Sequence, residues 1–195
     1  TDPDTSDSQS YSFTDSAGGR FAINSSTGQI TVADGTLLDY ESATSHSVTV
    51  RVTDAGGLTY DETFTINLTN VNEAPLITSA AAASVTENQT AATTVTSSDV
   101  DGGAPVYSIA GGADAALFSI DSATGVLTFN AAPNYEAPTD AGGDNVYDVM
   151  VRVIDGNGGS DTQALAVTIT NVNEAPVITS NGGGATAGVS VAENQ

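Results

Sequence analysis

Side chains that carry oxygen recur at fixed places along this chain. The stretch Asn70–Pro75 (Asn-Val-Asn-Glu-Ala-Pro) returns unchanged as Asn171–Pro176, 101 residues later. Hard divalent cations such as calcium take about six to eight oxygens from carboxylates, amide side chains and backbone carbonyls. A linker of Asn, Asn and Glu supplies such oxygens, and its Pro restricts the backbone. These residue types predict calcium coordination.

Other acidic motifs accompany the linker in a fixed order. They are a Glu-Asn pair on a first strand, an Asp-x-Asp pair, a Leu-Asp-Tyr-Glu element, and an Asp that ends a Val-x-Val strand. The acids in these motifs are Glu87, Asp99, Asp101, Asp39, Glu41, Asp54 and Asp155. Any one of these motifs alone would be an ordinary surface turn. Their recurrence in order, in a chain with only three basic residues, indicates a cation site.

The composition narrows the class of protein. The formal charge is −21, from 24 acidic residues against 3 arginines and no lysine, so neither nucleic acid nor an anionic membrane surface is an expected partner. No apolar run is long enough to cross a membrane. Without cysteine there is no disulfide framework, and the compartment stays open. The acidic, lysine-free, Thr/Ser/Gly-rich composition is compatible with an extracellular bacterial protein.

Alternation with a period of two residues predicts an all-β chain. Val48, Val50 and Val52 alternate with polar residues, and the same pattern returns 101 residues later. A turn that ends at Gly28 separates two short apolar runs, and Gly125 holds the same place in the second copy. Glycine suits a hairpin position that needs a positive φ.

The repeat length predicts how the chain divides. Residues 1–75 are expected to form one repeat without its first strands, residues 76–176 a complete repeat, and residues 177–195 the first strand of a third. The last assignment rests on Ser190–Gln195, which nearly repeats Ser84–Gln89. The chain starts at Thr1 and cuts across the repeat, so it reads as a piece of a larger array.

Taken together, the ordered motifs resemble the cadherin repeat, in the bacterial cadherin-like form found in large surface proteins. The resemblance covers essentially the whole chain and is specific as a set. It implies tandem Greek-key β-sandwiches of about 100 residues, similar in architecture to immunoglobulin domains. It also implies that calcium-binding linkers join these sandwiches and that neighbouring repeats of the same chain share the ions.

The resemblance also implies a set of ligands. At the first junction, side chains or backbone carbonyls would come from Asp39, Glu41, Asn70, Val71, Asn72, Glu73, Ala74, Asp99, Asp101 and Asp155, around three ions. The second junction would use Glu87, Glu136, Asn171, Asn173 and Glu174. We expect it to be partly filled or empty, because the third repeat is cut short. Asp2, Asp4 and Asp54 would serve a preceding repeat.

The chain departs from the family pattern at a few of these positions. Asn70 and Glu73 stand where the animal family has Asp, which removes one charge and lengthens one side chain. In the second repeat the Leu-Asp-Tyr-Glu element becomes Pro133–Glu136 (Pro-Asn-Tyr-Glu), so one carboxylate is lost.

Taken together, the sequence predicts a calcium-stiffened spacer or adhesive stalk on a bacterial surface. One alternative is a binding module whose long, Gly-rich loop Ala137–Asn145 recognises a carbohydrate or a protein. Another is self-association, with Ser190–Gln195 donated as a strand to the incomplete first repeat of another chain. An enzyme is not expected, because no nucleophile motif accompanies the single histidine, His46, which we interpret as a solvated loop residue.

Overall fold

The computed structural model describes residues 8–178 and residue 193. The chain divides into two compact units. The first comprises Thr1–Glu73 with Asp99–Gly103, and the second comprises Ala74–Ser98 with Ala104–Gln195. Asp2, Asp4 and the predicted strand Ser190–Gln195, apart from Glu193, lie outside the described residues.

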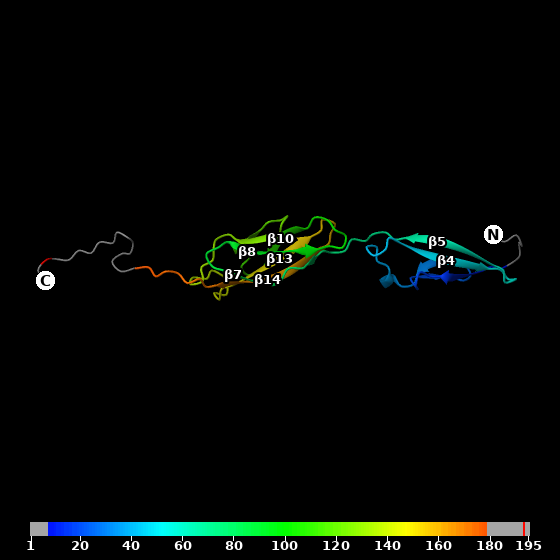
Figure 1. Ribbon diagram of the computed structural model, residues 1–195, viewed down its shortest axis with the longest axis horizontal. Coiled ribbons are helices and arrows are strands. Elements are labelled where there is room, and N and C mark those ends of the chain that lie inside the picture. The colour runs from blue at the N-terminus through cyan, green and yellow to red at the C-terminus, as the bar shows by residue number, and fades with distance from the viewer. Residues whose placement is uncertain (1–7, 179–192, 194–195) are drawn as a thin grey trace. The chain divides into compact units, whose positions relative to one another are not determined.

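The first unit holds five described strands and one 3-10 helix (Figure 1). They are β1 (Ser10–Asp15), β2 (Phe21–Ile23), β3 (Ile30–Val32), η1 (Gly35–Leu37), β4 (Ser45–Thr53) and β5 (Thr59–Asn67). One sheet has the strand order β1-β4-β5, and the hairpin β2-β3 forms the other. Phe21, Val48 and Val50 are buried between them, as the alternation of apolar residues predicts.

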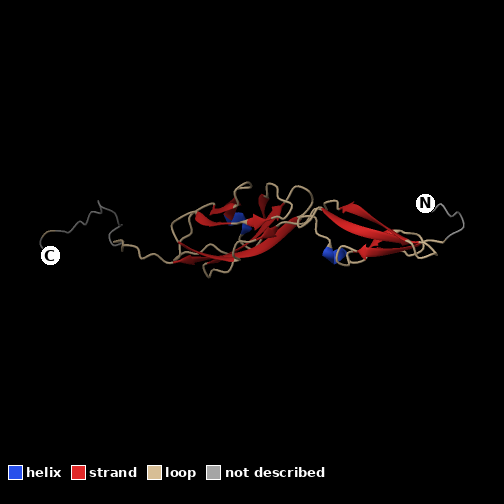
Figure 2. Cartoon of the chain, turned by 45° about the vertical axis from the view of Figure 1, so that its right-hand side comes forward, coloured by secondary structure: helices blue, strands red, loops and turns tan. Residues whose placement is uncertain are grey.

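The second unit has counterparts of these elements and four further strands before them. It contains β6 (Leu76–Ile77), β7 (Ala82–Thr86), β8 (Ala91–Thr94), β9 (Ser97–Ser98), β10 (Val106–Gly111), η2 (Ala115–Leu117), β11 (Phe118–Ile120), β12 (Val126–Phe129), β13 (Val146–Ile154) and β14 (Ser160–Thr170). One sheet has the order β10-β13-β14-β7 and faces a sheet of order β11-β12-β8, while β6 pairs with β9. Figure 2 shows that strands and loops make up nearly all of both units.

The core of the second unit lies between its two larger sheets. Phe118, Leu127 and Phe129 from β11 and β12 pack against Tyr147 and other buried residues of β13 and β14. The rings of Phe129 and Tyr147 meet edge to face, with centroids 5.2 Å apart. This two-layer arrangement confirms the predicted all-β sandwich.

Corresponding hairpins in the two units have the same backbone conformation at their turn glycine. Gly28, before β3, has φ +71°, and Gly125, before β12, has φ +70°. A Cβ at Gly125 would lie 2.2 Å from the carbonyl oxygen of Val95, so only glycine fits that turn. The hairpins predicted from the sequence are confirmed. The predicted boundary after Pro75 stays a prediction, since by its contacts Asp99–Gly103 belongs to the first unit.

No helix within residues 8–178 is long and apolar enough to cross a membrane.

Candidate metal centre

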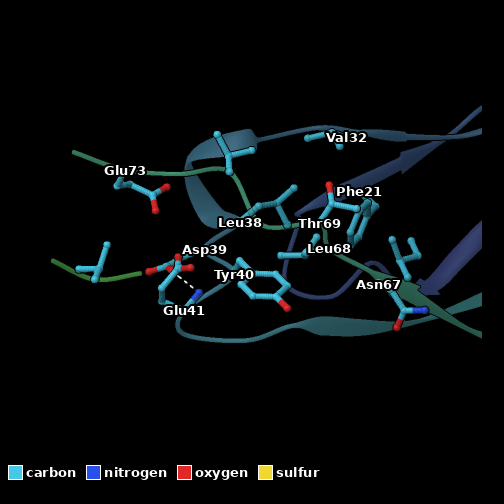
Figure 3. Close-up of a pocket in the computed structure, with 13 residues that line it drawn as sticks. Phe21, Val32, Leu38, Asp39, Tyr40, Glu41, Asn67, Leu68, Thr69 and Glu73 are labelled. Carbon is cyan, nitrogen blue, oxygen red and sulfur yellow. Dashed lines mark hydrogen bonds between the residues drawn. The ribbon is translucent and has the colours of Figure 1, made fainter. Parts of the chain in front are cut away.

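Three carboxylates gather in the first unit. Glu41 follows η1, Glu73 lies in the linker after β5, and Asp101 belongs to the segment Asp99–Gly103. One oxygen from each lies within 4.8 Å of the other two. Figure 3 shows Glu73 and Glu41 at one end of an open cavity whose other end is lined by apolar side chains. Segments that are distant in sequence thus bring the predicted ligands together.

Hydrogen bonds hold Asp101 in this cluster. Its two carboxylate oxygens accept from the side-chain Nδ2 of Asn70 and from the backbone N–H of Glu73, each at 2.7 Å. Its own N–H donates to Asp99 Oδ1 at 3.0 Å. The Asn70 amide lowers the pKa of Asp101, and the Glu73 N–H adds to this effect. Asp101 is therefore anchored as a charged group.

The pKa of Glu73 is raised, whereas that of Asp101 is lowered. Loss of hydration raises its pKa, and the negative charges of Asp101 and Glu41 raise it further. A carboxylate with two like charges beside it is stabilised when a cation joins the group. The cluster therefore has the electrostatics of a cation site.

A second cluster lies within the second unit. Its members are Glu87 at the end of β7, Glu136 in the loop after β12, and Glu174 in the second copy of the linker, and their oxygens lie within 4.8 Å of one another. Glu136 and Glu174 correspond in sequence to Glu41 and Glu73. The third carboxylate differs, being Glu87 here and Asp101 in the first unit.

Glu87 is the most buried of these acids, with only 3% of its surface exposed. Its two oxygens accept from the backbone N–H groups of Val172 and Tyr135, both at 2.8 Å, and these bonds lower its pKa. The Asn88 side chain donates to Glu174 at 3.0 Å, and Asn171 donates to Glu136. Asn88 was not among the predicted ligands. The recurrence of the Glu-Asn pair at Glu193 could have indicated that Asn88 belongs to the site.

Asp39 forms a turn and is not a member of the first cluster. Its Oδ1 accepts from the N–H group of Glu41 at 3.0 Å (Figure 3) and from that of Ser42 at 3.1 Å. The Ser42 hydroxyl is the main cause of its lowered pKa. Asn134 Oδ1 makes the same pair of bonds in the second unit, to Glu136 and Ala137. The change from Asp to Asn therefore preserves the turn that presents the glutamate.

Asp54 and Asp155 shape the turns after β4 and β13. Asp54 Oδ1 accepts from Leu58 N–H at 2.7 Å, and Asp155 accepts from the N–H groups of Asn157, Gly158 and Gly159. Asp54 lies at the opposite end of the nine-residue strand β4 from Glu41, so it does not join that cluster. The other predicted ligands, Val71, Asn72, Ala74 and Asn173, are exposed linker residues.

The clusters suit calcium in size and donor type. Calcium binds oxygens at about 2.3–2.6 Å, so two of its ligands are at most about 5 Å apart. In each cluster the three carboxylate oxygens lie within this limit of one another. Every donor is oxygen, which hard cations prefer. The residues thus fit a divalent ion, which Glu41, Glu73 and Asp101 could hold in the first unit.

Family comparison now identifies the repeats. Residues 1–69 match the cadherin domain family, and residues 72–168 match the family described as the bacterial Ig domain. The chain is cadherin-like. Neither family is one of enzymes. The second match fits the immunoglobulin-like sandwich of the second unit.

Animal cadherins are among the relatives of this cadherin-like chain. It is 34% identical to the protocadherin-like wing polarity protein stan of Drosophila melanogaster over 89% of its own length and 5% of that protein. It is 28% identical to cadherin-related family member 2 of Mus musculus over 77% of its length and 12% of the relative. The chain therefore spans a small part of these proteins.

Solved cadherin structures have the same fold. Human protocadherin-24 EC1-2 aligns with a TM-score of 0.66 at 21% identity, covering 88% of this chain and 86% of that one. Mouse cadherin-23 EC22-24 aligns with a TM-score of 0.60 at 27% identity, covering 84% of this chain and 53% of the other. These likenesses confirm the cadherin-like sandwich fold.

Two other features differ from or refine the sequence interpretation. His46 is not a solvated loop residue. It lies in β4, is half-buried, and its ring centroid is 6.2 Å from that of Phe21. The loop Ala137–Asn145 is fixed internally, because buried Asp140 accepts the N–H groups of Asp144 and Asn145.

Proposed function

We propose that this chain is a calcium-binding segment of an extracellular adhesion protein, in which bound calcium stiffens a tandem array of repeats. The observation that supports it most is the cluster of Glu41, Glu73 and Asp101. One of its members, Glu73, belongs to the linker and lies two residues before Pro75, so an ion held by the cluster would fix the path of the linker there. The second cluster repeats the arrangement with residues of the second unit.

The family supports the adhesive setting. The cadherin-domain match and the cadherin relatives indicate an extracellular or cell-surface protein, and the bacterial Ig match is consistent with the bacterial surface location predicted from composition. The carbohydrate- or protein-binding alternative has less support, because the loop Ala137–Asn145 folds around its buried Asp140, which accepts two of the loop's own N–H groups. A glycan array would separate the two functions, since a pure spacer binds no glycan.

A calcium titration tests the proposal. We expect heat of binding in calorimetry and a rise in melting temperature, because each ion at ten times its dissociation constant adds about 1.4 kcal/mol. Glu41→Gln should weaken binding in the first unit only, and its counterpart Glu136→Gln in the second only. Failure of millimolar calcium to change either heat or melting temperature would refute the proposal.

If calcium stiffens the chain, removing it should also change the shape of the chain in solution. Chelation should increase the bending of the chain, seen as a broader distance distribution in X-ray scattering. Calcium that binds and stabilises the fold without changing this distribution would leave the chain a calcium-binding module but not a calcium-stiffened spacer.

A further inference from the structure

The larger sheet of the second unit has an outer face on which the charges balance. Side chains alternate between the two faces of a strand, so Asp148, Met150 and Arg152 of β13 point away from the core that holds Val149 and Val151. Asp148 and Arg152 are the only charged residues at outward positions of the described strands β10, β13, β14 and β7. In a chain of net charge −21, this face is therefore neutral.

The centre of this face is apolar and hollowed. Met150 is 40% exposed and pairs across the sheet with Ala164 of the adjacent strand β14 (Figure 1). The small side chains of Ala164 and Ala166 line an open hollow of about 350 Å³, whose rim includes Met150 and Asp148. A flexible methionine side chain suits such irregular space.

The two charged side chains of this face have no partner within the described residues. In the first unit the counterpart of Arg152 is Arg51, which donates two hydrogen bonds of 2.8 Å to Asp61. Thr162 takes the place of that aspartate opposite Arg152, so the Arg152 guanidinium has no ion pair there. Asp148 hydrogen-bonds to Asp114 through its backbone alone.

The first unit satisfies the same positions internally. There the counterparts of Met150 and Ala164 are Thr49 and Thr63, whose hydroxyl groups hydrogen-bond to each other at 3.1 Å. The second unit thus replaces a polar, internally paired surface with an apolar centre and two unpaired charges of opposite sign. Such a surface suits a partner that brings the complementary charges.

The arrangement on β13 is complementary to itself. Asp148 and Arg152 each lie two residues from Met150, on opposite sides of it. A two-fold axis that lies between two facing sheets and crosses β13 at right angles at Met150 reverses the strand direction. It sets Asp148 of each copy opposite Arg152 of the other, and a two-fold contact requires this self-complementarity.

We propose that the outer face of β13 and β14 docks onto the same face of a second copy of this chain, with Met150 on the two-fold axis. Two ion pairs between Asp148 and Arg152 flank the contact. The two Met150 side chains meet at the centre and bend into the hollows beside Ala164. Facing sheets pack about 10 Å apart, a gap that an arginine and an aspartate bridge from opposite sides.

The size of the face indicates a weak contact that is independent of calcium. A sheet of four strands, the longer ones at least nine residues long, presents about 19 Å by 30 Å, or roughly 570 Å². A standard interface buries about 800 Å² on each partner. None of the six carboxylates of the two metal clusters lies on β13 or β14. The contact therefore forms at high protein concentration, with or without the ion.

Charge reversal tests the ion pairs. In EDTA, the mass of the full chain in sedimentation should rise with concentration. Arg152→Asp and Asp148→Arg should each abolish the rise, because like charges then face each other, and the double reversal should restore it. Arg51→Asp changes the net charge as much as Arg152→Asp does and should leave the association unchanged.

Three outcomes of this experiment overturn the proposal. The first is a full chain that stays monomeric up to about 1 mM. The second is a double reversal that associates no better than the single variants. The third is an Arg51→Asp chain that loses association as completely as Arg152→Asp, since net charge and not the docking face would then be the cause.

A cross-link tests the two-fold axis. The chain has no cysteine, so Met150→Cys places a single thiol on the axis, and a short bismaleimide should join two copies. Thr49→Cys, at the counterpart position of the first unit, should give no covalent dimer. Equal cross-linking at the two positions, or cross-linking of Met150→Cys that persists when Arg152→Asp is added, would refute the assigned face.

Discussion

The first residue of each linker copy contacts a carboxylate of the neighbouring cluster. Asn70 donates its amide to Asp101, and Asn171 donates to Glu136. The amide Nδ2 thereby donates to a carboxylate whose neighbours in the cluster are also carboxylates. An Asn at this position stabilises the ion-free form, whereas an Asp would add charge for a bound cation.

Asn70→Asp should therefore have opposite effects in the two states. We expect the ion-free protein to melt at a lower temperature, since a fourth carboxylate enters the cluster. Calcium affinity should rise about tenfold, because ligand charge tunes calcium sites. Isothermal titration calorimetry and thermal unfolding measure both effects.

The matched control is Asn24→Asp, which adds the same charge in a turn. Asn24 Oδ1 accepts from the N–H groups of Ser26 and Thr27, and Asp121 fills this position in the second unit, so Asp is tolerated there. If Asn24→Asp raised calcium affinity as much, the effect would belong to net charge and not to the cluster.

Asp114 fixes the long loop of the second unit. It is 4% exposed, and its two oxygens accept from the N–H groups of Ala141 at 2.7 Å and Asp148 at 2.8 Å. Asp114→Ala leaves both donors without a partner. Since both hydrogen bonds are only part-buried, each unmet donor should cost about 1 kcal/mol, so we expect a loss of roughly 2 kcal/mol, measured by denaturant unfolding. Asp148→Ala, at an exposed side chain, is the control and should change stability by less than about 0.5 kcal/mol.

At the scale of elements, the sequence predicted the strands well and the buried acids poorly. Alternation at Val149, Val151 and Val153 reports burial directly, because successive strand residues face opposite sides. Asp114 and Asp140 look like ordinary loop residues in the sequence. Their burial depends on which backbone N–H groups the fold turns toward them, and no local pattern encodes that.

For the candidate site, too, the sequence predicted some features and missed others. The repeated motifs predicted Glu41 and Glu73, because both copies carry a glutamate at these places, and Asp101 was predicted from the Asp-x-Asp motif, which occurs once. The sequence could not separate these from Asp39, whose side chain completes a turn. It also missed how Glu87 reaches Glu174, which depends on the parallel pairing of β7 with β14.

The turn between β11 and β12 gives a pH prediction. The hydroxyl of Thr124 is the main cause of the lowered pKa of Asp121, and the N–H groups of Thr124 and Ala123 add to it. A carboxyl whose pKa is lower in the folded state stabilises the fold above its unfolded pKa, near about 3.9. This contribution is lost as the pH falls through the folded value.

Asp121→Asn should remove that contribution while keeping an oxygen acceptor, as Asn24 does in the first unit. In calcium-free buffer the wild type should be more stable at neutral pH, and the difference should shrink below about pH 4. Urea unfolding over this pH range measures it. A difference that stayed constant down to the lowest pH would contradict the assignment to ionisation.

For the whole molecule, charge is the dominant feature. The chain carries a net charge of −21. Within residues 8–178, Arg51 pairs with Asp61 at 2.8 Å. Most carboxylates instead accept backbone N–H groups in turns. Folding therefore brings like charges together. The concentration of cations in solution should determine how much this repulsion lowers the free energy of unfolding.

Salt and calcium should therefore both weaken the repulsion between the carboxylates. Raising NaCl from about 0.01 M to about 0.15 M shortens the screening length from roughly 30 Å to 8 Å, so the calcium-free protein should melt at a higher temperature. If calcium binds the carboxylate clusters as proposed, saturating calcium neutralises them, and the slope of melting temperature against salt should then be smaller. Scanning calorimetry at matched osmolality, with sucrose replacing salt in the control, separates screening from solvent exclusion. Equal slopes with and without calcium would show that the ions bind away from the clusters that dominate the repulsion.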